Sequence, residues 1–152
     1  MMPLPLFVYG TLRDPDLLAG VLGRRLGSDA VHSARAPGFR VVAYPGRIYP
    51  ALVRAPGAAA DGLLLTGLTP FERDLLDAYE GEEYRRDTIA TILADEPELH
   101  EAETYMPAIT VASGSAGWQL ADWQRHHKQR ILVAETATAQ DLRRRLIAIR
   151  PN

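Results

Sequence analysis

The stretch LLDAYEGEEYRR, residues 75–86, has the pattern of a helix end, a glycine stop and the start of a strand. Glu80 lies at this junction. The partial negative charge at a helix C-terminus disfavours an ionised carboxylate, and the nearby Asp77, Glu82 and Glu83 act in the same direction. A carboxylate in an energetically unfavourable position, with no visible contribution to the stability of the fold, is typical of a functional site. The alternative is an ordinary solvated acidic loop.

The segment before this stretch predicts how its helix begins. Thr69 can act as N-cap, Pro70 fits the first helical position, and Glu72 completes a capping box. Gly81 is expected to end the helix. A long strand is then expected over residues 84–93, because Thr, Ile and Ala partly alternate there.

Short apolar runs separated by Gly and Pro predict further strands. Pro37-Gly38 is expected to turn the chain between two of them, and residues 56–60 to form a flexible connection. Pro50 is expected to keep the extended piece 47–53 from being a central strand throughout. The remaining strands are expected at residues 4–9, 31–36, 39–44, 61–68 and 101–105.

Helices are expected at both ends of the chain. The first begins at Asp14-Pro15, as N-cap and first helical residue, and ends at Gly23. Residues 118–135 are expected to form a second helix, and residues 138–149 a third that is capped at Thr138. Strands followed by helices favour an α+β domain, and many short strands favour a mixed, barrel-like sheet.

The composition limits the classes of function. A length of 152 residues predicts one domain over residues 1–152, with its C-terminal helices starting at about 118. The net charge of −2 gives no general attraction to nucleic acid or to an anionic membrane. Cysteine is absent, and there is no signal peptide pattern and no apolar run of about 20 residues. These features favour a cytoplasmic protein with no membrane partner.

The loop after the first strand is a candidate binding site. Gly10 follows an apolar run and precedes a helix, so it permits close approach of a ligand to the backbone. The amides of such a turn can bind an anion, and Thr11 adds a hydroxyl. A simple strand-to-helix turn is the alternative. Paired with Glu80, the loop could serve proton transfer on a small acidic substrate.

Four segments in this order resemble the γ-glutamylcyclotransferase-like superfamily. They are FVYGTL (7–12), GRIYPALV (46–53), GLLLTGLT (62–69) and LLDAYEGEEYRRDTI (75–89). The resemblance is nearest to the AIG2-like branch, which also has a Trp-rich C-terminal helix similar to residues 118–123. It extends from Phe7 to about Glu135.

This resemblance implies a small mixed β-barrel with flanking helices. It also implies an enzyme that releases 5-oxoproline and an amine from a γ-glutamyl amide by intramolecular attack, with no metal or cofactor. Glu80 matches the acid/base of the family, and Tyr84 and Tyr49 match tyrosines that line the site. The residues that match the substrate-binding loop are Val8, Tyr9, Gly10, Thr11, Leu12 and Arg13.

Several alternatives stay open at this point. Glu82 and Glu83 have the same chemistry as Glu80 and compete with it as base. A non-catalytic ligand-binding or protein-binding domain could keep the same fold, and so could an enzyme that removes or transfers a γ-glutamyl group in a biosynthetic pathway. The sequence fixes neither the amine half of the substrate nor the oligomeric state.

Other clusters predict no further site. His126 and His127 are adjacent, so they point about 100° apart on a helix, and His32 and His100 are isolated in the sequence. No metal site is therefore predicted. The arginines at 143–145 spread around a helix without an aromatic stacking set, which favours a solvated face over nucleic-acid binding.

Overall fold

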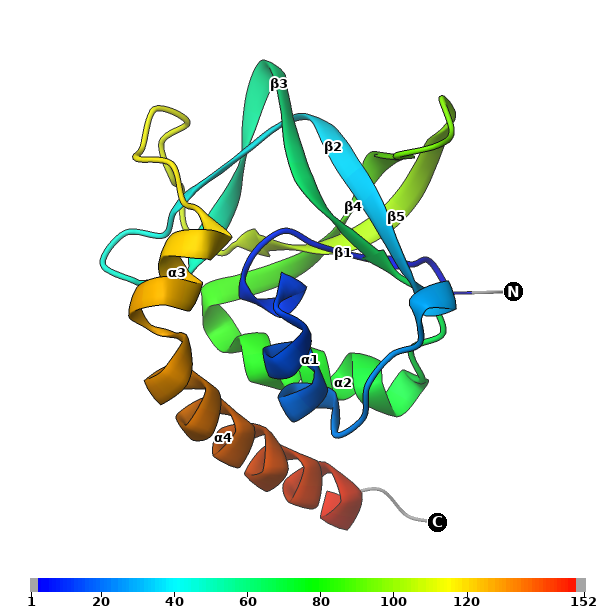
Figure 1. Ribbon diagram of the computed structural model, residues 1–152, viewed down its shortest axis with the longest axis vertical. Helices are drawn as coiled ribbons and strands as arrows, with labels where there is room; N and C mark the ends of the chain where they lie inside the picture. Colours follow the sequence, from blue (N-terminus) through cyan, green and yellow to red (C-terminus); the bar gives the residue numbers. More distant parts are fainter. Residues whose placement is uncertain (1–2, 150–152) are drawn as a thin grey trace.

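The structure is a computed structural model that describes residues 3–149 (Figure 1). Its strands form a closed barrel in the order β1-β3-β2-β4-β5, and helices flank the barrel. This α+β architecture confirms the predicted fold class. The strands are β1 (Leu6–Val8), β2 (Val31–Ala43), β3 (Pro50–Leu65), β4 (Tyr84–Leu93) and β5 (Leu99–Pro107). The helices are α1 (Pro15–Leu22), α2 (Pro70–Glu80), α3 (Leu120–His126) and α4 (Lys128–Ile149).

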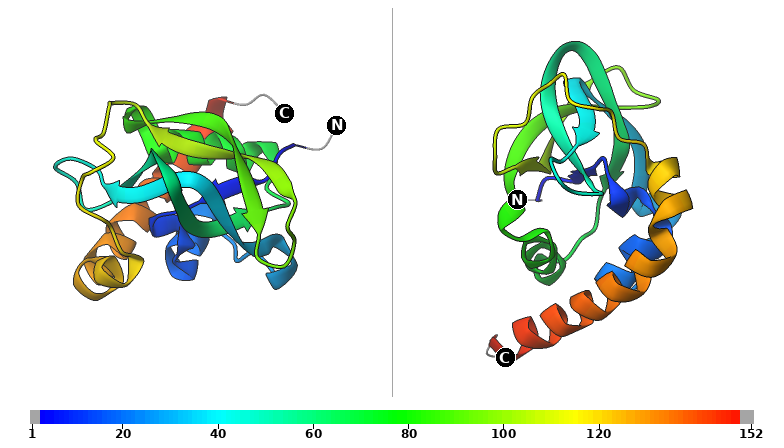
Figure 2. Two further views of the ribbon diagram at one scale, coloured as in Figure 1. Left: turned by 90° about the horizontal axis from the view of Figure 1, so that it is seen from above. Right: turned by 90° about the vertical axis from the view of Figure 1, so that its left-hand side faces the viewer.

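The barrel is mixed because of one strand pair. β1 pairs antiparallel with β3 and parallel with β5, and the pairs β2–β3, β2–β4 and β4–β5 are antiparallel. Helices α1 and α2 lie together on one side of the barrel, and α4 runs along them (Figures 1 and 2). No helix within residues 3–149 combines the length and the apolar character needed to cross a membrane.

The helix and the strand that meet within residues 75–86 form as predicted. The Thr69 hydroxyl accepts from the Glu72 amide, and the Glu72 carboxylate accepts from the Thr69 amide, so the capping box is complete. Helix α2 ends at Gly81, whose φ of 68° is accessible to glycine without a side-chain clash. One 3-10 turn follows, and β4 begins at Tyr84.

The prediction of separate strands in the region 31–68 is wrong. The predicted strand 31–36 and residues 39–43 of the predicted strand 39–44 belong to one strand, β2, and the predicted flexible connection 56–60 lies inside β3. The register of the β2–β3 ladder shifts beside Pro37, opposite the second Pro-Gly pair, Pro56-Gly57. Each pair makes an irregularity in a continuous strand, where a proline is tolerated, instead of reversing the chain.

The predicted boundary between the last two helices is also wrong. The chain breaks at His127, whose φ and ψ are not helical, and α4 is continuous from Lys128 to Ile149. Thr138 is not an N-cap: its hydroxyl donates to the carbonyl of Ala134 at 3.1 Å, inside the helix. This local bond is available to any mid-helix threonine, which is why the capping pattern was misleading.

Strand β1 separates two layers of the core. Leu6 and Val8 pack with the helices, whereas Phe7 packs inside the barrel with Leu52 and Leu64. Alternation along the strand produces this division. The chain that leaves β1 therefore emerges where the barrel meets the helices.

Candidate active site

A cavity of about 230 Å³ lies at this meeting point. It is lined by the end of β1 and the following loop, by the C-terminus of α2, and by α3 and α4. The sequence-predicted residues that line it are Val8, Tyr9, Gly10, Thr11, Leu12, Tyr49, Glu80 and Tyr84. The other lining residues are Phe7, Leu17, Ile48, Pro50, Tyr79, Glu83, Tyr105, Trp123, Ile131 and Glu135.

Arg13 is the predicted binding residue that does not line the cavity. Burial lowers the pKa of its guanidinium, and the carboxylate of Asp61 on β3 acts in the opposite direction. The Arg13 guanidinium therefore interacts electrostatically with Asp61 of β3. The prediction that Arg13 binds the substrate receives no support from its position.

The loop after β1 is held close to β3. A Cβ at Gly10 would lie 2.6 Å from Cγ of Pro50, so a larger residue would push the two segments apart. The loop continues as a 3-10 turn over Thr11–Arg13, in which the Arg13 amide donates to the Gly10 carbonyl at 3.1 Å. Glycine is required here because of this close approach to Pro50.

Glu80 is a partly buried carboxyl that lines this cavity at the last residue of α2. Within residues 3–149, its carboxyl makes no hydrogen bond and no ion pair. Burial raises its pKa to about 8, and the carboxylates of Glu135 and Asp77 contribute to the rise. An acid with a pKa near neutrality can both accept and donate a proton at physiological pH.

The neighbouring acids differ from Glu80 in their partners. The carboxylate of Glu83 accepts from Nε of Arg47 at 2.7 Å and from the hydroxyl of Tyr49. The Tyr49 hydrogen bond is the largest influence on the pKa of Glu83, which lies below its ordinary value. Glu82 is exposed and does not line the cavity. Of the three competing acids, only Glu80 is both in the cavity and unpaired among the described residues.

Tyrosines form much of the wall, and hydrogen bonds fix their hydroxyls. Tyr84 donates to the Pro50 carbonyl at 2.5 Å, and Tyr9 donates to the Tyr105 carbonyl at 2.5 Å. Tyr105 in turn donates to the carboxylate of Asp77 at 2.7 Å. Burial is the main reason why the pKa of each of these three hydroxyls is raised. These three tyrosines are uncharged, and with their hydroxyls fixed they line the cavity together with Glu80.

Glu135 is a cavity residue that the sequence reasoning missed. It comes from α4, 55 positions after Glu80 in the chain, and burial raises the pKa of its carboxyl. A signal was present in the sequence. Ile131, Glu135 and Ala139 are spaced by four residues, so they share one face of a helix, and a carboxylate in such an apolar stripe is unusual.

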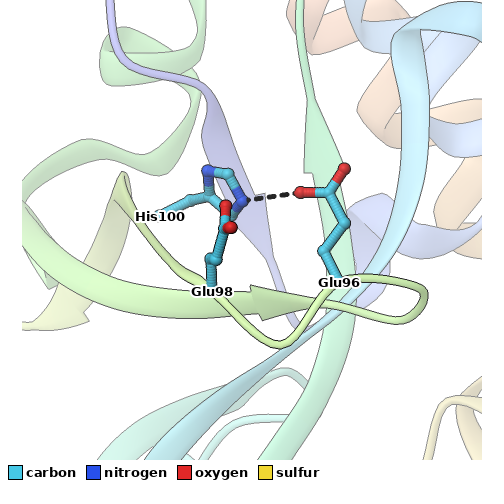
Figure 3. Close-up of side chains that lie close together, drawn as sticks. All are labelled: Glu96, Glu98 and His100. Carbon is cyan, nitrogen blue, oxygen red and sulfur yellow. Dashed lines mark hydrogen bonds and ion pairs between the residues drawn. The ribbon is translucent and has the colours of Figure 1, made fainter.

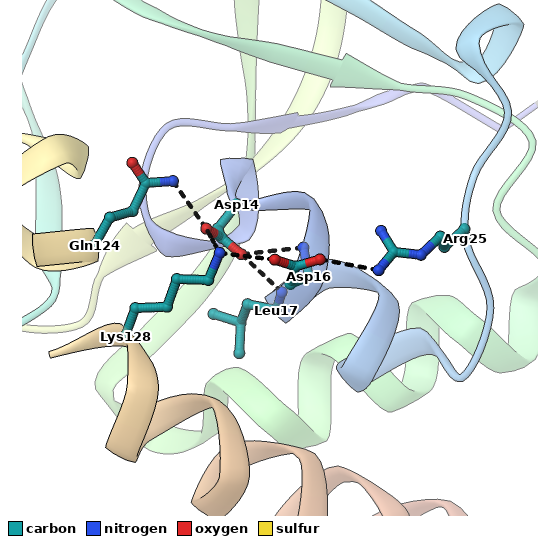
Figure 4. Close-up of polar contacts among 6 residues, drawn as sticks. All are labelled: Asp14, Asp16, Leu17, Arg25, Gln124 and Lys128. Carbon is teal, nitrogen blue, oxygen red and sulfur yellow. Dashed lines mark hydrogen bonds and ion pairs between the residues drawn. The ribbon is translucent and has the colours of Figure 1, made fainter.

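Polar contacts hold α4 against α1 (Figure 4). Asp14 caps α1 by accepting from the amides of Asp16 and Leu17, and its buried carboxylate also accepts from Gln124 at 2.8 Å. Nζ of Lys128 lies 2.9 Å from Asp14 and 2.7 Å from Asp16. The first turn of α4 is therefore fixed to α1, which sets the position of the cavity wall.

His100 is not isolated in the folded chain, in contrast to the prediction. Its Nε2 lies 3.0 Å from the Glu96 carboxylate, and Glu98 stands beside it at the β4–β5 turn (Figure 3). Both glutamates are exposed. The cluster is separate from the cavity.

The raised pKa of Glu80 predicts a pH-dependent stability. The folded protein holds a proton up to about pH 8 that the unfolded chain releases near pH 4.5, so the free energy of unfolding falls as pH rises between these values. One pKa unit corresponds to about 1.36 kcal/mol, and solvent in the cavity reduces the effect. We expect Glu80→Gln to be more stable than wild type at pH 8 by about 1–2 kcal/mol.

Thermal melts of both proteins at pH 5 and pH 8 measure this difference. The variant should melt several degrees higher at pH 8, while the two proteins should melt nearly together at pH 5, where both side chains are neutral. An equal difference at both pH values would show that packing, and not charge, distinguishes the variant.

Comparisons with known proteins show the family of this chain. The family model described as Gamma-glutamyl cyclotransferase, AIG2-like, matches residues 6–125. AIG2-like protein A of Arabidopsis thaliana is 35% identical over 127 residues, which are 83% of this chain and 75% of the relative. A solution structure from Arabidopsis thaliana has a TM-score of 0.65 at 30% identity, over 97% of this chain and 94% of that one.

A solved gamma-glutamyl cyclotransferase shares the fold with a TM-score of 0.53 at 15% identity, over 98% of this chain and 89% of that one. The family model covers most of the chain, including the loop after β1 and the α2–β4 junction. The chain therefore belongs to the gamma-glutamyl cyclotransferase family, AIG2-like.

Proposed function

We propose that this protein is an enzyme that converts a γ-glutamyl amide into 5-oxoproline and a free amine, with Glu80 as its acid/base. The observation that carries the proposal is an unpaired carboxyl with a pKa of about 8, which lines a cavity together with a glycine loop. Family membership agrees with this chemistry.

The proposed reaction begins with the α-ammonium group of the γ-glutamyl unit, which cannot attack while it is protonated. The Glu80 carboxylate takes one proton, and the free amine attacks the γ-carbonyl carbon of the same molecule. A carbon–nitrogen bond forms, and the carbonyl oxygen becomes an oxyanion. Holding the substrate folded supplies the proximity that makes this attack fast.

Collapse of this intermediate completes the reaction. Protonated Glu80 gives its proton to the leaving nitrogen as the old carbon–nitrogen bond breaks, and the oxyanion returns to a carbonyl. The new ring nitrogen then loses its second proton to Glu80, which passes it to the departing amine. The ammonium loses two protons in all, the amine gains two, and Glu80 is regenerated as a carboxylate.

The anionic part of the substrate would be bound by backbone. Among the described residues that line the cavity, none has a basic side chain. The amides of the loop after Tyr9 are then the proposed donors to the substrate α-carboxylate or to the oxyanion. No step of this proposal requires a metal or a cofactor, and the proposed partner is a small γ-glutamyl compound.

A binding domain without turnover is the second candidate. A pure binder has no use for an unpaired carboxyl whose pKa lies near neutrality, so Glu80 favours the enzyme. An enzyme that removes or transfers a γ-glutamyl group is a variant of the first candidate, since it would use the same carboxyl.

The test is a panel of γ-glutamyl peptides and γ-glutamylamines incubated with the purified protein, with 5-oxoproline measured by chromatography. The proposal expects 5-oxoproline in a 1:1 ratio with the free amine from at least one member. Release of free glutamate instead would favour hydrolysis, and no product from any member would favour the binding domain.

A further inference from the structure

Glu135 lines the cavity but has no partner among residues 3–149. Its carboxyl makes no hydrogen bond or ion pair with any residue in the range 3–149, and the residue is only partly exposed. A half-buried carboxylate normally has a partner, because removing its hydration is costly. Glu135 therefore lacks the compensation that a purely structural acid would have.

The other acids near Glu80 are compensated. Asp77 accepts from Tyr105 and lies 3.4 Å from Arg86, and Glu83 is bound by Arg47. The remaining titratable groups that act electrostatically on Glu80 or line the cavity with it are the hydroxyls of Tyr9, Tyr49, Tyr79, Tyr84 and Tyr105. Apart from Glu80, Glu135 is the acid that lines the cavity without a partner among the described residues.

The cations of α4 are engaged elsewhere. Lys128 binds Asp14 and Asp16, and Arg143 donates to the Val21 carbonyl at 2.9 Å, which ties the helix to α1. Glu135 lies between these two attachment points, seven residues after the first and eight before the second. The helix is thus anchored on both sides of a carboxylate that faces the cavity.

We propose that Glu135 binds the α-ammonium group of the substrate and holds it beside Glu80, the carboxylate that takes its proton. This inference rests on the proposed cyclotransferase activity. The α-ammonium is the cation that every γ-glutamyl amide carries. Glu80 and Glu135 are the two lining acids without a partner among the described residues, and none of the described lining residues is basic. One carboxylate keeps the amine in place while the other changes its protonation state.

Binding of two ligands that differ only in the ammonium group tests the proposal. The ligands are γ-glutamyl-n-propylamide and glutaryl mono-n-propylamide, titrated by calorimetry into Glu80→Gln and into the double variant Glu80→Gln/Glu135→Gln. The first substitution removes the proposed base, so turnover is slow during the titration. Loss of Glu135 should raise the Kd of the ammonium ligand at least tenfold and change that of the glutaryl ligand less than twofold.

Two other results of this titration overturn the assignment of Glu135. Equal weakening of both ligands would indicate a packing role, and unchanged binding of both would show that Glu135 does not contact the ammonium. If the substrate panel yields 5-oxoproline while Glu135→Gln leaves ammonium binding intact, only the role of Glu135 fails. If the panel yields none while the tenfold effect is seen, the proposed activity fails and the ammonium site remains.

A second readout does not depend on ligand or turnover. Carbon-detected NMR of the Glu80 carboxyl should show its pKa falling by about one unit in Glu135→Gln, because a neighbouring negative charge has been removed. Asp141→Asn is the matched control, since Asp141 lies on the same helix but pairs with Arg145 outside the cavity. An unchanged titration of Glu80 in Glu135→Gln would show that the two carboxyls do not share the cavity.

Discussion

Glu80→Gln should reduce kcat/KM for release of 5-oxoproline by about 10³-fold. General acid–base catalysis contributes roughly 10²–10⁴-fold, and Glu80 is proposed to act in both directions. Glutamine keeps the size of the side chain and its position at the end of α2, so the loss reflects proton transfer and not a change in shape. Steady-state kinetics on the best substrate of the panel measure the effect.

Glu82→Gln is the matched control for this substitution. Glu82 is two residues away, has the same chemistry, and is exposed outside the cavity. Its variant should retain activity within about twofold of wild type, because surface substitutions of this kind change stability by only about 0.5 kcal/mol. Full turnover by Glu80→Gln, or a similar loss in both variants, would contradict the assignment of Glu80 as acid/base.

Asp14→Ala should destabilise the fold by about 3–5 kcal/mol. The substitution removes the N-cap of α1 and one of the two carboxylates that bind the partly buried Lys128, and breaking a buried ion pair is costly. Gln124 also loses its acceptor. Urea unfolding followed by circular dichroism measures the change, and the melting temperature should fall by roughly 10 °C.

Asp14→Asn separates the contribution of the helix cap from that of the ion pair with Lys128. Asparagine is a good N-cap but has no charge, so this variant should lose only the part that depends on Lys128. Burial acts to raise the pKa of Asp14, but the hydrogen bonds from Gln124, Leu17 and Lys128 hold it below its ordinary value. The stabilisation is therefore present above the unfolded pKa and is lost as pH falls through the folded one.

At low pH the Asp14→Ala variant and the wild type should accordingly converge in stability. A destabilisation that stays constant from pH 7 to pH 3 would indicate that the side chain acts through its volume alone. A destabilisation below 1 kcal/mol at pH 7 would show that the network in Figure 4 does not hold α1 and α4 together.

The sequence by itself determined the elements whose signals are local. The capping box at Thr69, the N-cap at Asp14 and the stop at Gly81 each involve residues within one helical turn, so a short window contains the whole interaction. The same locality placed Glu80 at the end of α2 and the glycine loop after β1.

Tertiary structure decided what depends on distant partners. The Pro-Gly pairs at 37–38 and 56–57 have the local pattern of turns, but their pairing across the β2–β3 ladder keeps both strands continuous. The roles of Glu83 and Glu80 can be distinguished only because Glu83 is paired with Arg47 and Tyr49, which lie 36 and 34 residues away in the chain.

Glu135 is the clearest example of a site residue whose position depends on distant contacts. Its place in an apolar helical stripe was visible in the sequence, but the contacts that bring α4 to the cavity are made by Lys128 with Asp14, 114 positions apart. The packing of α4 on α1 therefore determines that a second carboxylate joins Glu80, because charge interactions act through space and not along the chain.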